Sequence, residues 1–348
     1  MKKAVLLAAA ALSLVACGKT YLDEPVAQNS IGFNTWNDVM TKAAKTVFAA
    51  DDEFDVFGFK WNSEPSATAT VFDDVDVKYD GTSWSYSPLR FWDSNYDNYT
   101  FFAAYPKDQL TTKPAQTGLF VSNELTYNGK DEVLLVAQKK DVVKGDYGKD
   151  VQLKFKHVGS LVDIKVKKHS DIAAAKVEVT SIALSGIKTT GTFTVGSYDS
   201  NNNPVGTWAP TSTTNTAVDP YVSNATVTLA KDNGVGTTNA AALLSNLVLM
   251  PQDLAKTEGP KITISYKITT GESGSEDVIT FEDKPIFFGE FDKSEEGDSE
   301  KANKDPRISA WMPGVHYTYY ITINANAITF TASIDSWNEE TGHYYLVK

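Results

Sequence analysis

Most of the chain alternates between hydrophobic and polar residues in short runs. The alternation is clearest in seven segments rich in Thr, Tyr, Val, Ile and Phe: 54–61, 99–106, 151–157, 161–169, 261–269, 317–324 and 328–337. A period of two with such residues predicts strands that bury one face. Between them lie turns rich in Gly, Asn and Asp. Short strands separated by turns favour β-sandwiches over alternating strands and helices, so we predict an all-β fold.

One of these segments is apolar on both faces. In YTFFAAYP (99–106), successive aromatic and alanine side chains point to opposite sides. This pattern predicts a central strand that is covered on both faces. Pro106 lacks an N–H group and ends the pairing. Helical periodicity is scarce, and its best candidate, residues 36–48, has no clear apolar stripe.

Three polar stretches interrupt the strands. Residues 138–150 lie between two strong strand runs and predict a linker between two domains, 29–146 and 147–348. Residues 197–223 are rich in Ser, Thr and Asn, and residues 290–307 are highly charged. Both compositions predict solvated loops. A chain of 348 residues is long enough to bury two cores.

The N-terminus has the pattern of an export signal. Lys2 and Lys3 precede an apolar run, Val5 to Ala16, of about twelve residues. A membrane-spanning helix needs roughly 20 residues, so this run is too short to cross a bilayer and is typical of a secretory signal peptide. We predict that residues 1–16 are this signal and direct the chain to the Sec pathway.

The only cysteine of the chain follows this run directly. A single cysteine forms no disulfide within the chain, and Leu-Val-Ala-Cys (14–17) resembles the lipobox of bacterial lipoproteins. In that motif the signal is cut between Ala16 and Cys17, and the thiol is acylated, with palmitate as a typical chain. The sequence predicts a lipid anchor at Cys17, a linker over 17–28, and a place at the outer membrane and cell surface.

The charge of the chain is strongly acidic. Cleavage before Cys17 removes two of the 32 basic residues and none of the 44 acidic ones, so the net charge of −12 becomes −14. Nucleic-acid binding depends on lysines and arginines that neutralise phosphates. Attraction to an anionic membrane surface likewise needs a basic cluster. The composition therefore argues against both partners.

The sequence holds no motif of an enzyme or a metal site. Nucleophile-elbow, phosphate-loop and dinucleotide patterns are absent. None of the four histidines has a neighbouring ligand in the sequence: His157, His169, His316 and His343. Two acidic stretches resemble a calcium loop only in part, because its glycine and glutamate are missing: Asp73, Asp74, Asp76 and Asp80, and DSNYDN (93–98). We predict no enzymatic activity, no cofactor and no metal.

Several segments occur in the order found in one known family. They are FAADDEFDVFGFKW (48–61), WSYSPLRFWDSNYDNYTFFAAYP (84–106), DEVLLVAQ (131–138), VQLKFKHVGSLVDIKVK (151–167), LVLMPQ (247–252), MPGVHYTYYITI (312–323) and IDSWNEE (334–340). Together they resemble the fimbrillin (FimA/Mfa-like) superfamily of type V pilins and related surface lipoproteins. The resemblance implies two tandem β-sandwich domains of transthyretin-like, Greek-key type.

The resemblance also implies assembly by donor-strand exchange. In the family's stalk subunits a protease removes an N-terminal strand after an arginine, and the C-terminal strand of the next subunit fills the groove. Here residues 29–36 are the candidate strand, with Ile31 and Phe33 on one face. This region has no arginine, so Lys42 and Lys45 are the candidate processing sites.

The end of the chain, HYYLVK, is the candidate donor strand. Tyr344 and Leu346 alternate with Tyr345 and Val347. Added to an open sheet edge of another subunit, such a strand would supply main-chain hydrogen bonds and alternate side chains. The alternative is that it completes its own sheet as an edge strand.

We therefore predict a structural subunit of cell-surface fimbriae with a role in adhesion. Its partners would be other pilin subunits, the membrane through the lipid anchor, and a host or bacterial surface ligand. The alternative is a non-polymerising surface lipoprotein that binds glycans or host ligands through exposed aromatic residues. A hydrolase that uses paired carboxylates is a third alternative, because the sequence does not show which acidic residues lie together.

Overall fold

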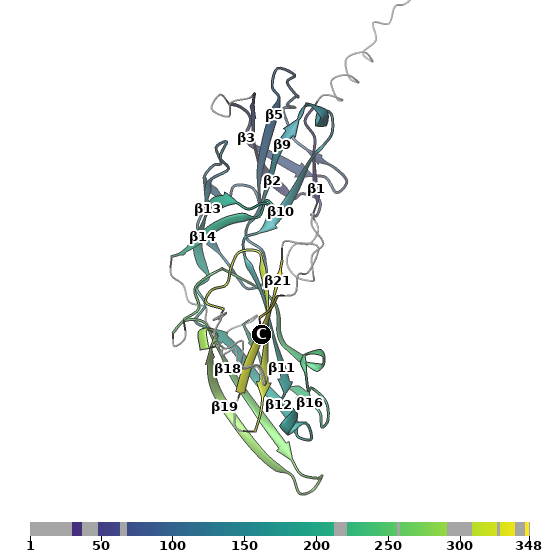
Figure 1. Ribbon diagram of the computed structural model, residues 1–348, viewed down its shortest axis with the longest axis vertical. Coiled ribbons are helices and arrows are strands. Elements are labelled where there is room, and N and C mark those ends of the chain that lie inside the picture. Colours follow the sequence, from purple (N-terminus) through teal and green to yellow (C-terminus); the bar gives the residue numbers. More distant parts are fainter. Residues whose placement is uncertain are drawn as a thin grey trace, which may run out of the picture.

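The structure is a computed structural model and describes residues 30–36, 48–62, 68–211, 221–255, 258–290, 308–325, 328–337 and 345–347. Within these residues it forms strands β1 to β22 and four three-residue 3-10 helices: η1 (Lys144–Asp146), η2 (Ser170–Ile172), η3 (Thr237–Asn239) and η4 (Phe288–Glu290). None of these helices is long and apolar enough to span a membrane. The molecule is elongated, with two groups of sheets along its long axis (Figure 1). The predicted all-β fold is confirmed.

A seven-stranded sheet is the basis of the first group. Its strands, in spatial order, are β1 (Phe33–Trp36), β10 (Val151–His157), β9 (Leu135–Val143), β5 (Asn98–Tyr105), β2 (Glu53–Trp61), β3 (Ala69–Tyr79) and β4 (Trp84–Ser85). All neighbours pair antiparallel except β1 and β10, which are parallel. The two edge strands approach each other. The indole N–H of Trp84 on β4 donates to the hydroxyl of Thr35 on β1 over 3.1 Å. The sheet thus curls around an aromatic core, and β1 lies in the seam.

The strand that the sequence predicts to be central lies in the middle of this sheet. β5 pairs with β9 on one side and β2 on the other. Tyr99, Phe101 and Ala103 belong to the core inside the curl, whereas Phe102 and Ala104 belong to clusters on the opposite face. The prediction of two covered faces is confirmed.

A smaller sheet covers that opposite face. It consists of β14 (Pro204–Pro210), β13 (Thr190–Tyr198), β7 (Phe120–Ser122) and β6 (Leu110–Thr112), and β8 (Leu125–Thr126) also pairs with β13. The prediction of a loop over 197–223 was wrong at three places: residues 197–198 end β13, residues 204–210 form β14, and residues 222–223 form the short strand β15. β14 pairs with β13 alone, and an edge strand tolerates proline at its ends because one row of its N–H groups is unpaired.

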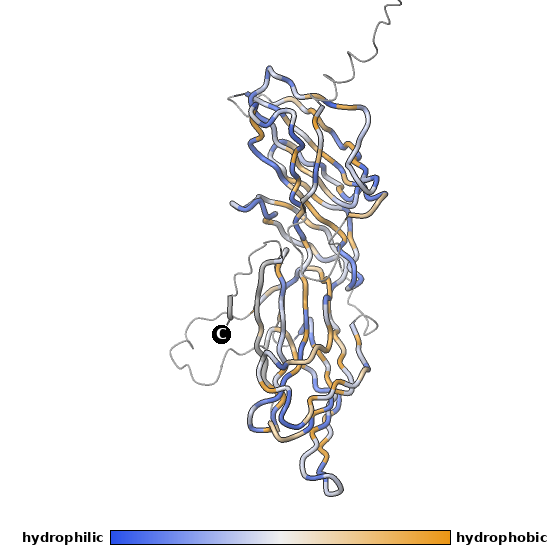
Figure 2. The backbone as a smooth tube through the Cα atoms, turned by 90° about the vertical axis from the view of Figure 1, so that its right-hand side faces the viewer, coloured by the Kyte–Doolittle hydropathy of each residue, from blue (hydrophilic) through white to orange (hydrophobic). Residues whose placement is uncertain are grey.

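The second group is a sandwich of two sheets. One contains β17 (Ala241–Leu249), β11 (Ser160–Lys168), β20 (Val315–Ile323), β21 (Ile328–Ser336) and β22 (Tyr345–Val347). The other contains β15 (Val222–Ser223), β12 (Lys176–Ser185), β18 (Lys261–Thr270) and β19 (Asp277–Phe287), with β16 (Val227–Leu229) also on β12. Their facing apolar side chains form one large core, and hydrophobic and polar residues alternate along the strands (Figure 2).

The structure differs from the prediction of a linker over 138–150. β9 extends to Val143, η1 follows, and β10 then pairs antiparallel with β9. Residues 138–143 are therefore the end of β9, and residues 144–150 are a solvated connection within the seven-stranded sheet. The division into two domains stays a prediction.

Candidate functional site

The seam of the seven-stranded sheet holds residues 30–36, which we call the seam segment. Its strand, β1, pairs with β10 alone, with Phe33 opposite Val151. Main-chain hydrogen bonds hold it from both sides. The Ile31 N–H donates to the Arg90 carbonyl over 2.9 Å, and the Val151 N–H donates to the Gly32 carbonyl over 2.8 Å.

Two side chains of the seam segment lie inside the curled sheet. Ile31 is 0% exposed and Phe33 is 4% exposed. The centre of the Phe33 ring lies 5.2 Å from that of Phe72, and 5.8 Å from those of Tyr86 and Phe101. Full burial of such a side chain contributes about 1.5–3 kcal/mol. The seam segment is thus anchored chiefly by these two apolar side chains.

Tyr86 clamps the seam segment from the side of β4. Its hydroxyl donates to the Ile31 carbonyl over 2.7 Å and accepts from the Arg90 N–H over 3.2 Å. Burial raises the pKa of Tyr86 above its usual value of 10.0. The hydroxyl therefore keeps its proton at physiological pH and remains a donor to the strand.

A cleft of about 350 Å³ opens beside the seam segment. Side chains from both edges of the sheet line it, among them Asn34, Thr35, Ser83, Trp84 and Asp150. One edge of β1 therefore pairs with β10, whereas the other is held by side chains and a few turn contacts. β1 is therefore an edge strand of the described sheet, with β10 as its strand partner.

The end of the chain lies at an edge of the second group. β22 pairs antiparallel with β21, with Ile334 opposite Tyr345 and Ala332 opposite Val347. It has no other strand partner among the described residues. In this structure the tail completes its own sheet, as one of the two predicted alternatives requires.

Several predicted site residues lie outside the described part of the chain. They are Ala16 and Cys17 of the signal and anchor, Lys42 and Lys45 of the processing region, and Tyr344 of the donor strand. The candidate helix also falls there over residues 37–47. These assignments stay predictions.

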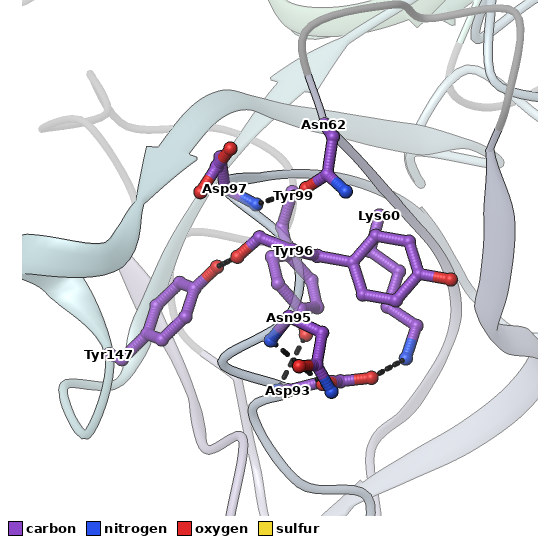
Figure 3. A network of polar contacts seen from close by, with 8 residues as sticks. All are labelled: Lys60, Asn62, Asp93, Asn95, Tyr96, Asp97, Tyr99 and Tyr147. Atoms are coloured by element: carbon purple, nitrogen blue, oxygen red, sulfur yellow. Dashed lines mark hydrogen bonds and ion pairs between the residues drawn. The ribbon is translucent and has the colours of Figure 1, made fainter.

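The calcium-like segment 93–98 is a closed loop at the end of the seven-stranded sheet (Figure 3). Asp93 forms an ion pair with the Lys60 ammonium over 2.7 Å. It also accepts hydrogen bonds from the backbone N–H and the side-chain amide of Asn95. Asp97 forms an ion pair with Lys144 over 2.6 Å. The Lys60 ammonium lowers the pKa of Asp93 below its usual range. Protein cations thus neutralise both carboxylates of this loop.

The second acidic stretch is held in the same way. Asp74 forms an ion pair with Lys113, Asp76 with Lys107 over 2.8 Å, and Asp80 accepts from the N–H groups of Thr82 and Ser83 over 2.7 and 2.8 Å. Among the described residues no group of three or more His, Cys, Asp or Glu is placed to hold a metal ion.

Sequence analysis missed one unusual carboxylate, Asp55. Asp55 on β2 is 1% exposed; its Oδ2 accepts from the Asp108 N–H over 2.7 Å, and its Oδ1 has no hydrogen-bond partner among the described residues. Burial, with added repulsion from Asp74, raises its pKa to about 7. The alternation around Asp55 marks a strand but does not show that its polar side is covered.

The three described histidines each face a carboxylate. His157 lies 2.8 Å from Glu132 and stacks on Trp337 at 3.7 Å between ring centres. His316 lies 3.0 Å from Asp163, and His169 lies 3.2 Å from Asp171. These contacts join strands and turns, which fits structural roles.

The comparisons with known proteins first define the class, which is that of bacterial fimbrial proteins. Fimbrium subunit Fim1C of Phocaeicola vulgatus is 23% identical to this chain in an alignment 391 residues long. The alignment covers 97% of this chain and 97% of that protein. The family model described as fimbrillin-like matches residues 41–337. The chain belongs to this fimbrillin-like family.

Solved structures of similar fold include two fimbrial proteins of Porphyromonas gingivalis. The tip fimbrial protein Mfa3 with C-terminal truncation has 11% identity and a TM-score of 0.34, over 83% of this chain and 95% of that one. The fimbrilin of strain W83 has 9% identity and a TM-score of 0.39, over 90% and 98%. The resemblance stated from the sequence motifs is confirmed by the family match. The family match and the fimbrium subunit among the relatives support a fimbrial role at the cell surface.

Proposed function

We propose that this protein is a structural subunit of a fimbria that polymerises when a strand of another subunit replaces its seam segment. The observation that supports the proposal is the position of β1. It is a short strand in the seam of a curled sheet, anchored by Ile31 and Phe33. Its departure would leave an apolar groove between β10 and β4 for an extended segment with side chains of the same spacing.

The pairing direction favours replacement. β1 pairs in parallel with β10 over four residues, and parallel pairing is slightly less stable per residue than antiparallel pairing. A longer donor strand that entered antiparallel would form more and better main-chain hydrogen bonds. It would also cover the open sheet edges that otherwise favour aggregation.

The C-terminal tail has the required spacing. Tyr344 and Leu346, or Tyr345 and Val347, would take the places of Ile31 and Phe33. Because β22 is a three-residue edge strand with β21 as its partner, its detachment costs few hydrogen bonds. We propose that it leaves its own subunit and enters the groove of the next.

A disulfide lock tests this proposal. Ser333 of β21 and Leu346 of β22 are partners in the strand register, so the double variant Ser333→Cys, Leu346→Cys should bond the tail to its own sheet. We expect the oxidised form to yield no detergent-resistant polymers by gel electrophoresis, and the reduced form to yield them normally. Each single-cysteine variant serves as the control, and polymers from the oxidised double variant would refute the donor role.

We also propose that Cys17 carries the lipid that holds the precursor at the outer membrane, and that cleavage near Lys42 or Lys45 frees the seam segment. Replacing Cys17 by alanine should move the protein from the membrane fraction to the soluble fraction and remove the acyl mass from the mature N-terminus. Two acyl chains are needed for stable anchoring. Unchanged membrane association of Cys17→Ala would show that another segment is the anchor.

A further inference from the structure

Each of the two groups of sheets has an outer end that lies away from the other group (Figure 1). In the first group β10 starts at Val151, and the chain leaves its other end for β11 of the second group, which starts at Ser160. The start of β10 therefore lies at the outer end. β1 runs parallel to β10 with Phe33 opposite Val151. Ser30, and the backbone of Phe91 that bridges to it, thus lie at this outer end too.

The outer end of the second group is the turn between β18 and β19. Lys261 at the start of β18 pairs with Ser185 of β12, from which the chain continues to β13 of the first group. Thr270 and Asp277, at the other ends of β18 and β19, pair with each other. Residues 271–276 join these two strands, and the hairpin projects away from the first group (Figure 1).

The tip of this hairpin is acidic and partly apolar. Residues 271–279 include three acidic residues and no basic one. One of the three is paired with a lysine, whereas Glu276 and Asp277 form no ion pair with a described lysine or arginine. Val278 and Ile279, which follow directly, are 54% and 53% exposed. We call these four residues, from Glu276 to Ile279, the acidic tip.

The outer end of the first group presents a positive charge. Residues 87–90, which we call the Arg90 loop, border the seam segment, because the Arg90 carbonyl accepts from the Ile31 N–H. The Arg90 guanidinium donates to the Pro88 carbonyl over 3.2 Å and forms no ion pair with a described carboxylate. Leu89 beside it is 50% exposed. The loop thus pairs an exposed apolar side chain with a cation, as the acidic tip pairs apolar side chains with anions.

Most carboxylates near the Arg90 loop are already engaged. Asp93, Asp97 and Asp146, at the same end of the sheet, form ion pairs with lysines. The carboxylate of Asp150 lies beside Gly32 in the cleft of the seam. Arg90 is therefore available to an acidic partner from outside the subunit.

We propose that the acidic tip of one subunit binds the Arg90 loop of the next copy of this chain in the fimbria. This inference rests on the proposed strand exchange. The donor tail lies in the second group and the groove in the first, so exchange brings these groups of neighbouring subunits together. The two surfaces lie at opposite ends of one molecule and differ from each other. A contact between them joins subunits head to tail and, where it closes no ring, produces a filament.

The contact acts together with the donor strand. An exposed ion pair contributes little stability by itself. Once a donor strand links two subunits, however, the second contact forms within one assembly at a high effective concentration. Complementary charges at the rim of an interface act mainly on the rate of association. The rate of polymer formation is therefore the quantity to measure.

Exchange of charges between the two surfaces tests the proposal. Arg90→Glu and, separately, the tip variant Glu276→Arg, Asp277→Arg turn attraction into repulsion. Each should form detergent-resistant polymers about tenfold more slowly than the wild type, and the triple variant that combines these changes should regain most of the wild-type rate. The tip variant lies far from the seam segment, so its slower assembly counts even if Arg90→Glu also changes stability. An effect of Arg90→Glu on the seam alone would not be rescued from the opposite end.

The matched control reverses two exposed carboxylates in the middle of the molecule. Asp253 and Glu258 line the cleft between the two groups, and the variant Asp253→Arg, Glu258→Arg should assemble as the wild type does. A wild-type rate in the tip variant, no rescue in the triple variant, or an equal loss in the control would each overturn the contact and leave strand exchange standing. A wild type that forms no polymers would refute strand exchange itself, and this contact with it.

Discussion

Replacing Asp55 by asparagine is expected to remove a pH dependence of stability between about pH 4 and about pH 7. In the folded protein the pKa of Asp55 is about 7, raised first by burial from its ordinary value of 3.8. Between these values the folded state keeps a proton that the unfolded chain has released. The wild type should therefore lose stability as the pH rises through this window, and Asp55→Asn, which has no proton to lose, should not.

Thermal unfolding at about pH 5 and about pH 8 measures this effect. The pKa values of Asp80, Asp93 and Asp146 are lowered from 3.8, so their contributions change below the window. As a control, Asp277→Asn replaces an exposed carboxylate of β19 and should keep the wild-type difference between the two pH values. If Asp55→Asn shows the same difference as the wild type, the buried carboxylate does not carry the proton.

The local sequence predicted the strands and their covered faces well. The alternation at 54–61, 151–157 and 317–324 marked β2, β10 and β20, and the double-faced pattern of 99–106 marked the centre of the sheet. These features are local, because the alternation of apolar and polar residues along a strand shows directly whether one or both of its faces are buried. The family motifs fall on the same strands, which explains why they identified the fold.

Long-range pairing was not predictable in this way. β7 pairs with β13 about 70 residues later in the chain, and nothing in either short segment specifies the other. β14 was missed because Pro204 and Pro210 bound it, and the same prolines occur in loops. The linker was misplaced because polarity marks any solvated connection, including one inside a sheet.

In the seam segment, too, the local feature was predictable from the sequence and the long-range contacts were not. Ile31 and Phe33 were identified from their spacing, but the partners that hold them were not. Tyr86 and Trp84 lie some 50 residues away in sequence and come close only because the sheet curls until β4 meets β1. Spacing predicts which side chains are buried, whereas the groove that buries them is a product of topology.

Replacing Phe33 by alanine should have the largest effect of any single change in the seam segment. Loss of a fully buried phenylalanine costs about 3–5 kcal/mol, and here the ring contacts Phe72, Tyr86 and Phe101. We expect a lower midpoint in denaturant. We also expect faster polymer formation, because a weakened seam segment is displaced more readily by an incoming strand.

Two further variants make this result specific. Phe33→Leu keeps most of the apolar volume and should lie between the wild type and Phe33→Ala in both measurements. Phe91→Ala removes a ring that is 41% exposed in the neighbouring loop, whose backbone bridges Ser30, and should change neither measurement appreciably. If Phe33→Ala lowers stability but polymerises no faster than Phe91→Ala, the seam segment is a structural strand that stays in place, and the groove for an incoming strand lies elsewhere.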